Sequence, residues 1–297
     1  MELKKESIQM LRIKNKATSQ VTFDEDYNVP DVKPDIGRMV QSKAEVSMDE
    51  VRLSEGRALL KGTLNVDLLY VGEKEGKIYS LSAKLPMDEV INLEGIEGGD
   101  KLCLNWEIED LSVHVIHSRK LNIKAIVTFY AVVDELAEVK LPAALDDAEI
   151  SVKKKTIPLM NLCVHKKDTL RIKDDIILAS NRPNVENLLW YTIEPRNLDI
   201  RPEENKLRVK GELAVFVLYT GSEEENPPQW LEYIMPFNNE AECTGCLEEL
   251  IPHIEVSLIH QGMEVKPDSD GEERILQVDA VLELNMRMYK EEEHELL

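Results

Sequence analysis

The chain has 297 residues, a length that permits one large domain or two domains of ordinary size. A hydrophobic fraction of 43% predicts a packed core and excludes an intrinsically disordered chain. The 57 acidic and 36 basic residues give a net charge of −21, which disfavours nucleic acids and anionic membrane surfaces as partners.

The beginning of the chain carries no recognisable targeting segment. Residues 1–16, MELKKESIQMLRIKNK, lack the uninterrupted apolar stretch of a secretory signal peptide. No stretch reaches the ~18 consecutive apolar residues that a membrane-spanning helix requires. The 4 cysteines are too few for a disulfide framework. We therefore predict a cytoplasmic protein with reduced thiols and no membrane insertion.

The first regular element is ambiguous from its pattern alone. In residues 6–16, ESIQMLRIKNK, the apolar residues fit both the alternation of a strand and the spacing of a helix. Because the rest of the sequence has β patterns, we predict a strand there. Short helical turns are predicted at residues 33–41 and 182–190, since proline is well tolerated at a first helical position.

The strongest strand signal lies in residues 60–70, where apolar and polar side chains alternate as in a half-buried strand. The predicted inward face consists of Leu60, Gly62, Leu64, Val66, Leu68 and Tyr70. Residues 209–219 repeat the pattern, except that Phe216 and Leu218 make the outer face apolar as well. Residues 102–108 also alternate and place Trp106 with the core.

Further strands are predicted along the rest of the chain, separated by turns rich in glycine and acidic residues. These strands cover residues 111–117, 122–133, 198–211 and 275–289. Short strands with regular turns are typical of antiparallel sheets that pack as a sandwich or barrel.

The chain contains an internal duplication. Residues 61–72, KGTLNVDLLYVG, and 210–221, KGELAVFVLYTG, are identical at 7 of 12 positions at an offset of 149. The match continues at shifted offsets, with Pro86 over Pro236 and, at offset 143, His117 over His260. A period this long predicts two ordinary domains, not the short units of a solenoid.

We therefore predict an all-β protein with two tandem homologous domains and very little helix. Residues 1–147 and 148–297 form the two domains, each an antiparallel β-sandwich or barrel-like unit. Gly62 and Gly211, at matching positions of the repeated strand, are predicted to allow close approach of a neighbouring backbone.

Two sequence blocks resemble a known family. VPDVKPDIGRMV at residues 29–40, followed by LLKGTLNVDLLYV at residues 59–71, is similar to the signature of the SPOCS domain of clostridial spore-coat proteins of the SipL type. The second copy is a more divergent match in which Ala179 replaces Pro30. Proteins of this type usually carry a C-terminal LysM module, which the present sequence lacks; we expect a fragment or a member without that module.

The resemblance implies a non-catalytic scaffold that acts in spore coat assembly. It implies a location on the mother-cell side of the forespore surface and binding to other coat proteins, with the ATPase of the coat basement as one candidate partner. A homo-oligomer is a further possible assembly. The duplication fits this role, because a copied domain multiplies binding surface and avidity without new chemistry.

The candidate sites for chemistry each have a simpler explanation. Cys243 and Cys246 in CTGC have the spacing of a zinc or redox motif, with His253 and His260 as the nearest further ligands; ordinary loop or core thiols are the alternative. His114 and His117 lie three residues apart and therefore point to opposite faces of a regular strand. We predict no enzyme, and no catalytic, cofactor-binding or metal site.

Two acidic stretches invite binding hypotheses. Residues 268–273, DSDGEE, have the oxygen density that calcium favours, but a polar hairpin turn is the preferred interpretation. The acidic residues around the start of the signature are interpreted either as a solvated loop or as a contact for a basic partner. They are Asp24, Asp26, Asp31 and Asp35, with Asp175 at the position of Asp26 in the second copy.

The alternative function is a carbohydrate-binding β-sandwich. Sugar sites usually combine acids with aromatic platforms. An exposed row formed by Trp190, Trp230 and Tyr233 would favour this alternative, and burial of these side chains would weaken it.

Overall fold

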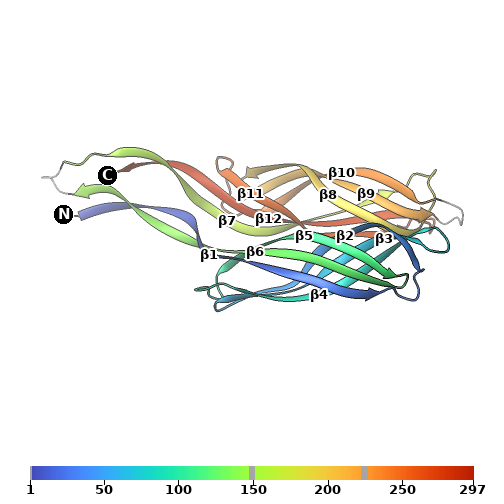
Figure 1. Ribbon diagram of the computed structural model, residues 1–297. Helices are drawn as coiled ribbons and strands as arrows, with labels where there is room; N and C mark the ends of the chain where they lie inside the picture. Colours follow the sequence, from blue (N-terminus) through green and yellow to red (C-terminus); the bar gives the residue numbers. More distant parts are fainter. Residues whose placement is uncertain (1, 147–150, 222–226) are drawn as a thin grey trace.

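A computed structural model describes residues 2–146, 151–221 and 227–297, and every regular element within them is a β-strand (Figure 1). The first repeat contains β1 (Glu2–Asn28), β2 (Ile36–Ser54), β3 (Arg57–Gly72), β4 (Ile78–Asn92), β5 (Lys101–His117) and β6 (Lys120–Asp146). The second repeat contains β7 (Lys155–Ile177), β8 (Val185–Glu203), β9 (Lys206–Gly221), β10 (Gln229–Glu242), β11 (Ile251–Pro267) and β12 (Glu273–Leu296). The predicted all-β class is confirmed. The predicted boundary between residues 147 and 148 lies outside the described residues.

Each repeat is built from two three-stranded antiparallel sheets. In the first repeat the strand orders are β2-β3-β4 and β1-β6-β5, and the second repeat has the same arrangement as β8-β9-β10 and β7-β12-β11. The chain crosses from one sheet to the other after β1 and after β4, and hairpins make the other connections within the repeat. The identical topology confirms two tandem homologous domains.

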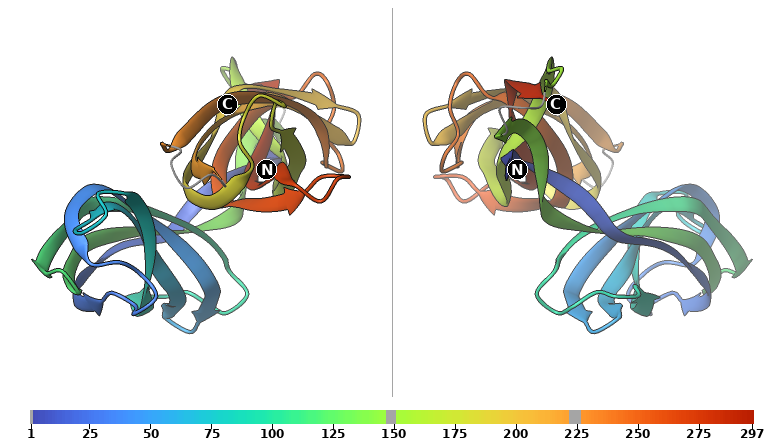
Figure 2. Two further views of the ribbon diagram at one scale, coloured as in Figure 1. Left: turned by 90° about the vertical axis from the view of Figure 1, so that its right-hand side faces the viewer. Right: turned by 90° about the vertical axis from the view of Figure 1, so that its left-hand side faces the viewer.

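The two sheets of a repeat curve toward each other at their edges. In the first repeat β2 lies beside β5 and β1 beside β4, although hydrogen bonds pair strands only within each three-stranded sheet. Figure 2 shows each repeat as a rounded wall of strands. The architecture is thus a β-sandwich with a barrel-like cross-section, as predicted.

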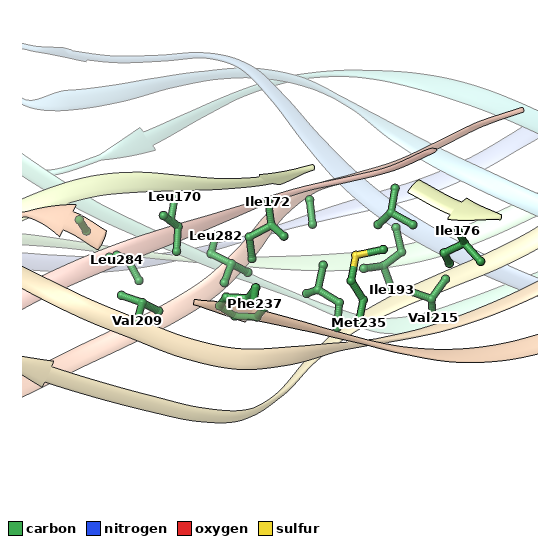
Figure 3. Close-up of a cluster of buried hydrophobic side chains, with 14 of the residues drawn as sticks. Leu170, Ile172, Ile176, Ile193, Val209, Val215, Met235, Phe237, Leu282 and Leu284 are labelled. Atoms are coloured by element: carbon green, nitrogen blue, oxygen red, sulfur yellow. The ribbon is translucent and has the colours of Figure 1, made fainter. Parts of the chain in front are cut away.

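The core of each repeat lies between its two sheets. The predicted inward face of β3 is buried along its whole length, from Leu60 to Tyr70. In the second repeat, side chains from both sheets meet in the same way, as Figure 3 shows for Ile172 and Leu282 on one sheet and Val215 and Met235 on the other. Period-two alternation therefore identified the buried face correctly.

The helical turns predicted at residues 33–41 and 182–190 are wrong. Residues 31–32 and 180–181 form turns, and strands β2 and β8 begin at Ile36 and Val185. Cross-strand pairing with β3 and β9 decides the conformation here, because tertiary contacts override weak local helix preferences. The strand predicted for residues 6–16 is confirmed as part of β1.

The pairing of β5 with β6 and of β11 with β12 corrects part of the predicted alignment between the two copies. Ile108 pairs with Val127 just before a β-bulge, and Leu258 pairs with Leu282 just before the corresponding bulge. The structural offset between β5 and β11 is therefore 150, and the predicted match of His117 with His260 at offset 143 is wrong. The hairpin that joins β11 to β12 is longer than the one that joins β5 to β6, and the change of offset to 155 in the last strands had hidden this register. The match of Pro86 with Pro236 is confirmed, since each faces the same position of the central strand.

The two glycines of the repeated strand approach different neighbours. A Cβ on Gly62 would lie 2.5 Å from the carbonyl oxygen of Ser47, which confirms the predicted close approach of a backbone. A Cβ on Gly211 would instead meet side-chain carbons of Leu198 at 2.7 Å and Phe237 at 2.8 Å. The prediction for Gly211 is therefore wrong, because side chains crowd the strand at this position.

An arginine fixes the connection between the two sheets of the first repeat. We call residues 29–35, which join β1 to β2, the first proline loop. Arg119, in the β5–β6 turn, donates from Nη1 to the Lys33 carbonyl at 2.6 Å and from Nη2 to the Val29 carbonyl at 3.0 Å. The hydroxyl of the buried Tyr70 donates to the Pro34 carbonyl at 3.1 Å. Three loop carbonyls are therefore satisfied by side chains from other strands and turns.

The second repeat reproduces this clamp on residues 178–184, the second proline loop. Arg274 donates from Nη2 to the Ala179 carbonyl at 2.6 Å and from Nη1 to the Asn184 side chain at 2.6 Å. Tyr219 donates to the Pro183 carbonyl at 3.4 Å. The replacement of Pro30 by Ala179 leaves the backbone hydrogen bond of the turn in place. The clamp is a property of both copies.

We expect Arg119→Ala to lower the free energy of unfolding by roughly 1–3 kcal/mol, because two loop carbonyls lose their donors in a partly buried position. Arg119→Lys should give an intermediate loss, since one ammonium cannot reproduce the planar fork. Urea unfolding followed by tryptophan fluorescence measures both. Arg201→Ala is the control, because that exposed side chain forms a surface ion pair with Asp199 two residues away. An Arg119→Ala protein as stable as this control would contradict the role of the clamp.

Gly62→Ala should destabilise the fold by roughly 1–3 kcal/mol, because the new methyl group would overlap a backbone oxygen that cannot move without shifting β2. Gly99→Ala is the matched control, since a Cβ there has no neighbour within 4 Å. Thermal unfolding of the two variants provides the comparison, and equal melting temperatures would refute the close packing at Gly62.

Candidate interaction surfaces

The two repeats contact each other through extended ends of their sheets. Both termini lie at the same end of the molecule, where the β1–β6 ribbon runs beside the β7–β12 ribbon (Figure 1). Ile8 and Leu162 are buried in this region. Asn161 accepts a hydrogen bond from the backbone nitrogen of Gln9 at 2.9 Å, and His294 Nδ1 lies 2.8 Å from a carboxylate oxygen of Glu6. Apolar and polar contacts thus hold the two ribbons together.

A second contact joins the outer face of the first repeat to strand β8. The Lys43 ammonium donates to the Tyr191 carbonyl at 2.7 Å. It also lies 4.9 Å from the centroid of the Trp190 ring and 4.7 Å from that of Tyr191, within the range of a cation–π interaction. Nearby, Gln261 donates to Glu45 at 3.0 Å. A lysine of the first repeat therefore packs on an aromatic surface of the second repeat.

A groove opens between the repeats next to this contact. Its volume is about 1240 Å³, larger than most small-molecule sites. The first proline loop and the β3–β4 hairpin contribute Val32, Ile78 and Tyr79, and the second repeat contributes Leu188 and Pro227. Val32 is 89% exposed at the tip of the clamped loop. We call this cleft the inter-repeat groove; its mixed apolar and polar lining suits a protein segment better than a compact metabolite.

The outward side of sheet β8-β9-β10 carries a cluster of large apolar side chains, which we call the aromatic face. It consists of Trp190, Phe216, Leu218, Trp230 and Ile234. Trp190 and Trp230 both pair with Leu218 and form a row across the three strands. Trp230 is 58% exposed and Ile234 52% exposed. An exposed apolar cluster of this kind marks an interaction site in soluble proteins.

The equivalent surface of the first repeat is mostly polar, with the buried Leu69 at the position of Leu218. Its β3 presents Asn65 and Asp67 where β9 presents Ala214 and Phe216. On β4 the positions of Trp230, Glu232 and Ile234 are occupied by Ser80, Ser82 and Lys84. The two copies therefore share a core and differ on this face.

The predicted aromatic row does not form on one surface. Trp190 and Trp230 share the outward face, but Tyr233 lies three residues from Trp230 on the same strand and points to the other side. Tyr233 is 44% exposed at the strand edge, and the Trp190 ring is contacted by Lys43. A flat three-ring sugar platform is therefore not assembled from these residues. Trp106 packs on the core beside Phe129, as predicted.

The CTGC residues occupy core positions. Cys243 and Cys246 are completely buried and belong to the hydrophobic cluster of the second repeat. The first repeat has Leu93 and Ile96 at these places, both equally buried. Backbone hydrogen bonds establish the equivalence: the Cys243 and Cys246 backbones bond to Asn205 as the Leu93 and Ile96 backbones bond to the β2–β3 turn. The thiols replace aliphatic side chains.

The chemistry of these thiols agrees with an apolar role. Burial raises the pKa of Cys246 to about 12 and also raises the pKa of Cys243. A high pKa keeps both sulfurs protonated at neutral pH, whereas zinc binding and disulfide exchange require thiolates. Among the described residues, no group of three or more His, Cys, Asp and Glu side chains could hold a metal ion.

The candidate histidines and the DSDGEE segment form hydrogen bonds within their own strands and turns. His114 lies 2.8 Å from the Ser112 hydroxyl, and His117 accepts a hydrogen bond from the Arg119 backbone at 3.2 Å. The Asp268 carboxylate accepts hydrogen bonds from the backbone nitrogens of Asp270 and Glu272 in the β11–β12 turn. The prediction of a polar hairpin turn is confirmed.

The acidic residues near the first proline loop have partners within the chain. Hydrogen bonds from Asn122 and Lys124 lower the pKa of Asp24, and those from Lys120 and Asn122 lower that of Asp26. Asp31 and Asp35 lie near the Arg119 guanidinium, and Asp175 accepts a hydrogen bond from Gln277. Asp24 and Asp26 lie in β1 and Asp175 lies in β7, so the loop interpretation applies to Asp31 and Asp35 alone. The contacts within the chain count against a docking site for a basic partner.

Sequence reasoning missed the clamp arginines and Lys43. Arg119 and Arg274 differ by 155 positions, the same offset that aligns the last strands of the two copies. The repeated arginine was therefore visible in the sequence, but the loop carbonyls to which it donates were not. Lys43 gave no signal, because nothing in the sequence places it against Trp190. Within the described ranges no helix is long and apolar enough to cross a membrane.

Comparison with known proteins gives one match. The model of a family described as SipL, SPOCS domain, matches residues 35–116 and 184–266, which together cover more than half of the chain. The matched stretches begin at equivalent places, one residue before β2 and β8, and end within β5 and β11. Neither the curated proteins nor the solved structures contain a match.

The core role of the thiols predicts that Cys243→Leu/Cys246→Ile folds like the unchanged protein, because it installs the pair that the first repeat uses. Urea unfolding should show a cooperative transition with a loss of no more than about 1–3 kcal/mol, the usual range for larger apolar side chains in a packed core. In the unchanged protein, a thiol reagent should label the exposed Cys163 and leave the buried pair unmodified until unfolding. Loss of folding on substitution, or release of zinc from the purified protein, would contradict this role.

Proposed function

The chain is a member of the SipL SPOCS-domain family, and we propose that it is a non-catalytic scaffold in spore envelope assembly. Family membership supports a role in sporulation. In the proposed role the protein binds other spore-coat proteins at the forespore surface, on its mother-cell side. The coat-basement ATPase is one candidate partner.

The observation that carries this proposal is the apolar surface exposed at the junction of the repeats. The inter-repeat groove and the aromatic face meet on β9, because Thr220, which lines the groove, points to the same side of the strand as Leu218 on the face. Exposed apolar side chains of this number weaken solubility unless a partner covers them. A surface built from two fixed domains offers a broad, shallow contact, which is typical of protein partners.

The absence of a catalytic role is supported by what the candidate side chains contact. The buried thiols replace aliphatic residues, and His114 and His117 bond within their own strand or turn. Nucleophilic or acid–base catalysis needs such groups to converge on a space that a substrate can enter. The groove between the repeats is lined by none of these four side chains.

The scaffold proposal predicts selective capture of coat proteins. Immobilised protein is incubated with lysates of sporulating and of vegetative cells, and the bound proteins are identified by mass spectrometry. We expect enrichment of spore-coat proteins from the sporulating lysate alone. An unrelated immobilised protein of similar negative charge is the control, because a net charge of −21 attracts basic proteins nonspecifically. Equal capture by this control, or no capture, would contradict the proposal.

A further inference from the structure

The aromatic face differs from the equivalent face of the first repeat in its large apolar side chains, and two of them, Trp230 and Ile234, are more than half exposed. We propose that it docks a cationic segment of a partner protein, in which lysine or arginine side chains alternate with apolar ones. This inference rests on the scaffold function and names the chemistry of one binding site within it.

The fold does not require the apolar side chains of this face. The first repeat builds the same three-stranded sheet with Ser80, Ser82 and Lys84 on the equivalent strand, and its core is packed equally well. Trp230 and Ile234 are more than half exposed, so they contribute little of the free energy that full burial would give the domain. The side chains are therefore explained by a contact with another molecule.

The charge pattern selects a cationic occupant. Strand β10 presents Trp230, Glu232 and Ile234 outward, so an exposed carboxylate stands between two exposed apolar side chains. The two apolar residues are roughly 13 Å apart along the strand, a span that about five residues of an extended partner would cover. An incoming lysine or arginine can pair with Glu232 while apolar neighbours cover Trp230 and Ile234. The net charge of −21 steers the same kind of partner toward the molecule.

The molecule already contains one example of the proposed contact. Lys43 of the first repeat lies over the rings of Trp190 and Tyr191 and donates to a carbonyl of the same strand. Trp230 stands in the same cross-strand row as Trp190, roughly 10 Å away on the opposite edge of the sheet. Lys43 covers the Trp190 end of the row. At the other end Arg182 donates to the Trp230 carbonyl at 2.8 Å, and the Trp230 side chain is 58% exposed.

A direct test uses the full chain and a synthetic probe. The probe is a ten-residue peptide that alternates lysine with valine and threonine, and two comparison peptides carry glutamate or acetyl-lysine in place of lysine. Binding is measured by calorimetry and by the tryptophan fluorescence of the protein. We expect only the lysine peptide to bind, and to bind more weakly at high salt.

Three variants locate the site. Trp230→Ser and Glu232→Ser install the residues of the first repeat and should each weaken binding, with about a tenfold loss for Trp230→Ser. Ile177→Ser removes an apolar side chain that is even more exposed, 73% against 58% for Trp230, from β7 on the other sheet, and should leave binding unchanged. Circular dichroism and urea unfolding verify that all three variants are folded.

Several results would overturn the inference. These are equal binding of the glutamate peptide, unchanged binding by Trp230→Ser, and displacement of the lysine peptide by cell-wall oligosaccharides. Sedimentation that reveals a dimer dissolved by Trp230→Ser would assign the face to a second copy of the chain instead. The lysate experiment separates the two proposals: coat-protein capture that survives Trp230→Ser keeps the scaffold function and removes this site. Absence of capture by the unchanged protein removes the scaffold function, whatever the peptide does.

Discussion

The hydrogen bonds from one arginine to the proline loop are the constraint on which each domain depends. The chain crosses between the two sheets at this loop, and a crossing leaves backbone carbonyls without ladder partners. Arg119, in the turn before β6, and Arg274, at the start of β12, supply the donors, so they fasten the first strand connection to the last hairpin of each repeat. A rigid crossing fixes how the sheets face each other, and therefore which side chains become core. The same rigidity holds Val32 at the rim of the inter-repeat groove.

On this shared frame the two copies have diverged on their outer faces. The first copy presents polar side chains and uses Lys43 to contact the second. The second presents Trp230 and Ile234 to solvent. In the proposed role, the outer face of the first copy contacts the second copy, and the outer face of the second copy binds a partner. One sheet face could not do both at the same time. The alternation of a strand makes this possible, because inward residues can stay constant while every second residue changes.

The CTGC segment shows how tertiary position decides the meaning of a motif. Spacing alone indicates zinc or redox chemistry, yet the equivalent residues of the first copy are Leu93 and Ile96. In a dry core a cysteine behaves as a small apolar residue, and burial raises its pKa away from the thiolate that chemistry needs. The internal repeat provides the comparison: both copies bury these two positions in the core, and the thiols fill the space that aliphatic side chains fill in the first copy.

The sequence by itself determined the β class, the buried face of the central strands and the duplication, because period-two alternation and self-similarity are local properties of the chain. The apolar outer face of β9 was also visible in Phe216 and Leu218. Only the tertiary structure decided the register of β5 and β11, the target of Arg119, the neighbour of Gly211 and the contact between Lys43 and Trp190. Each of these joins residues from different strands or repeats, and bulges and hairpin lengths that set such neighbours follow from pairing in space.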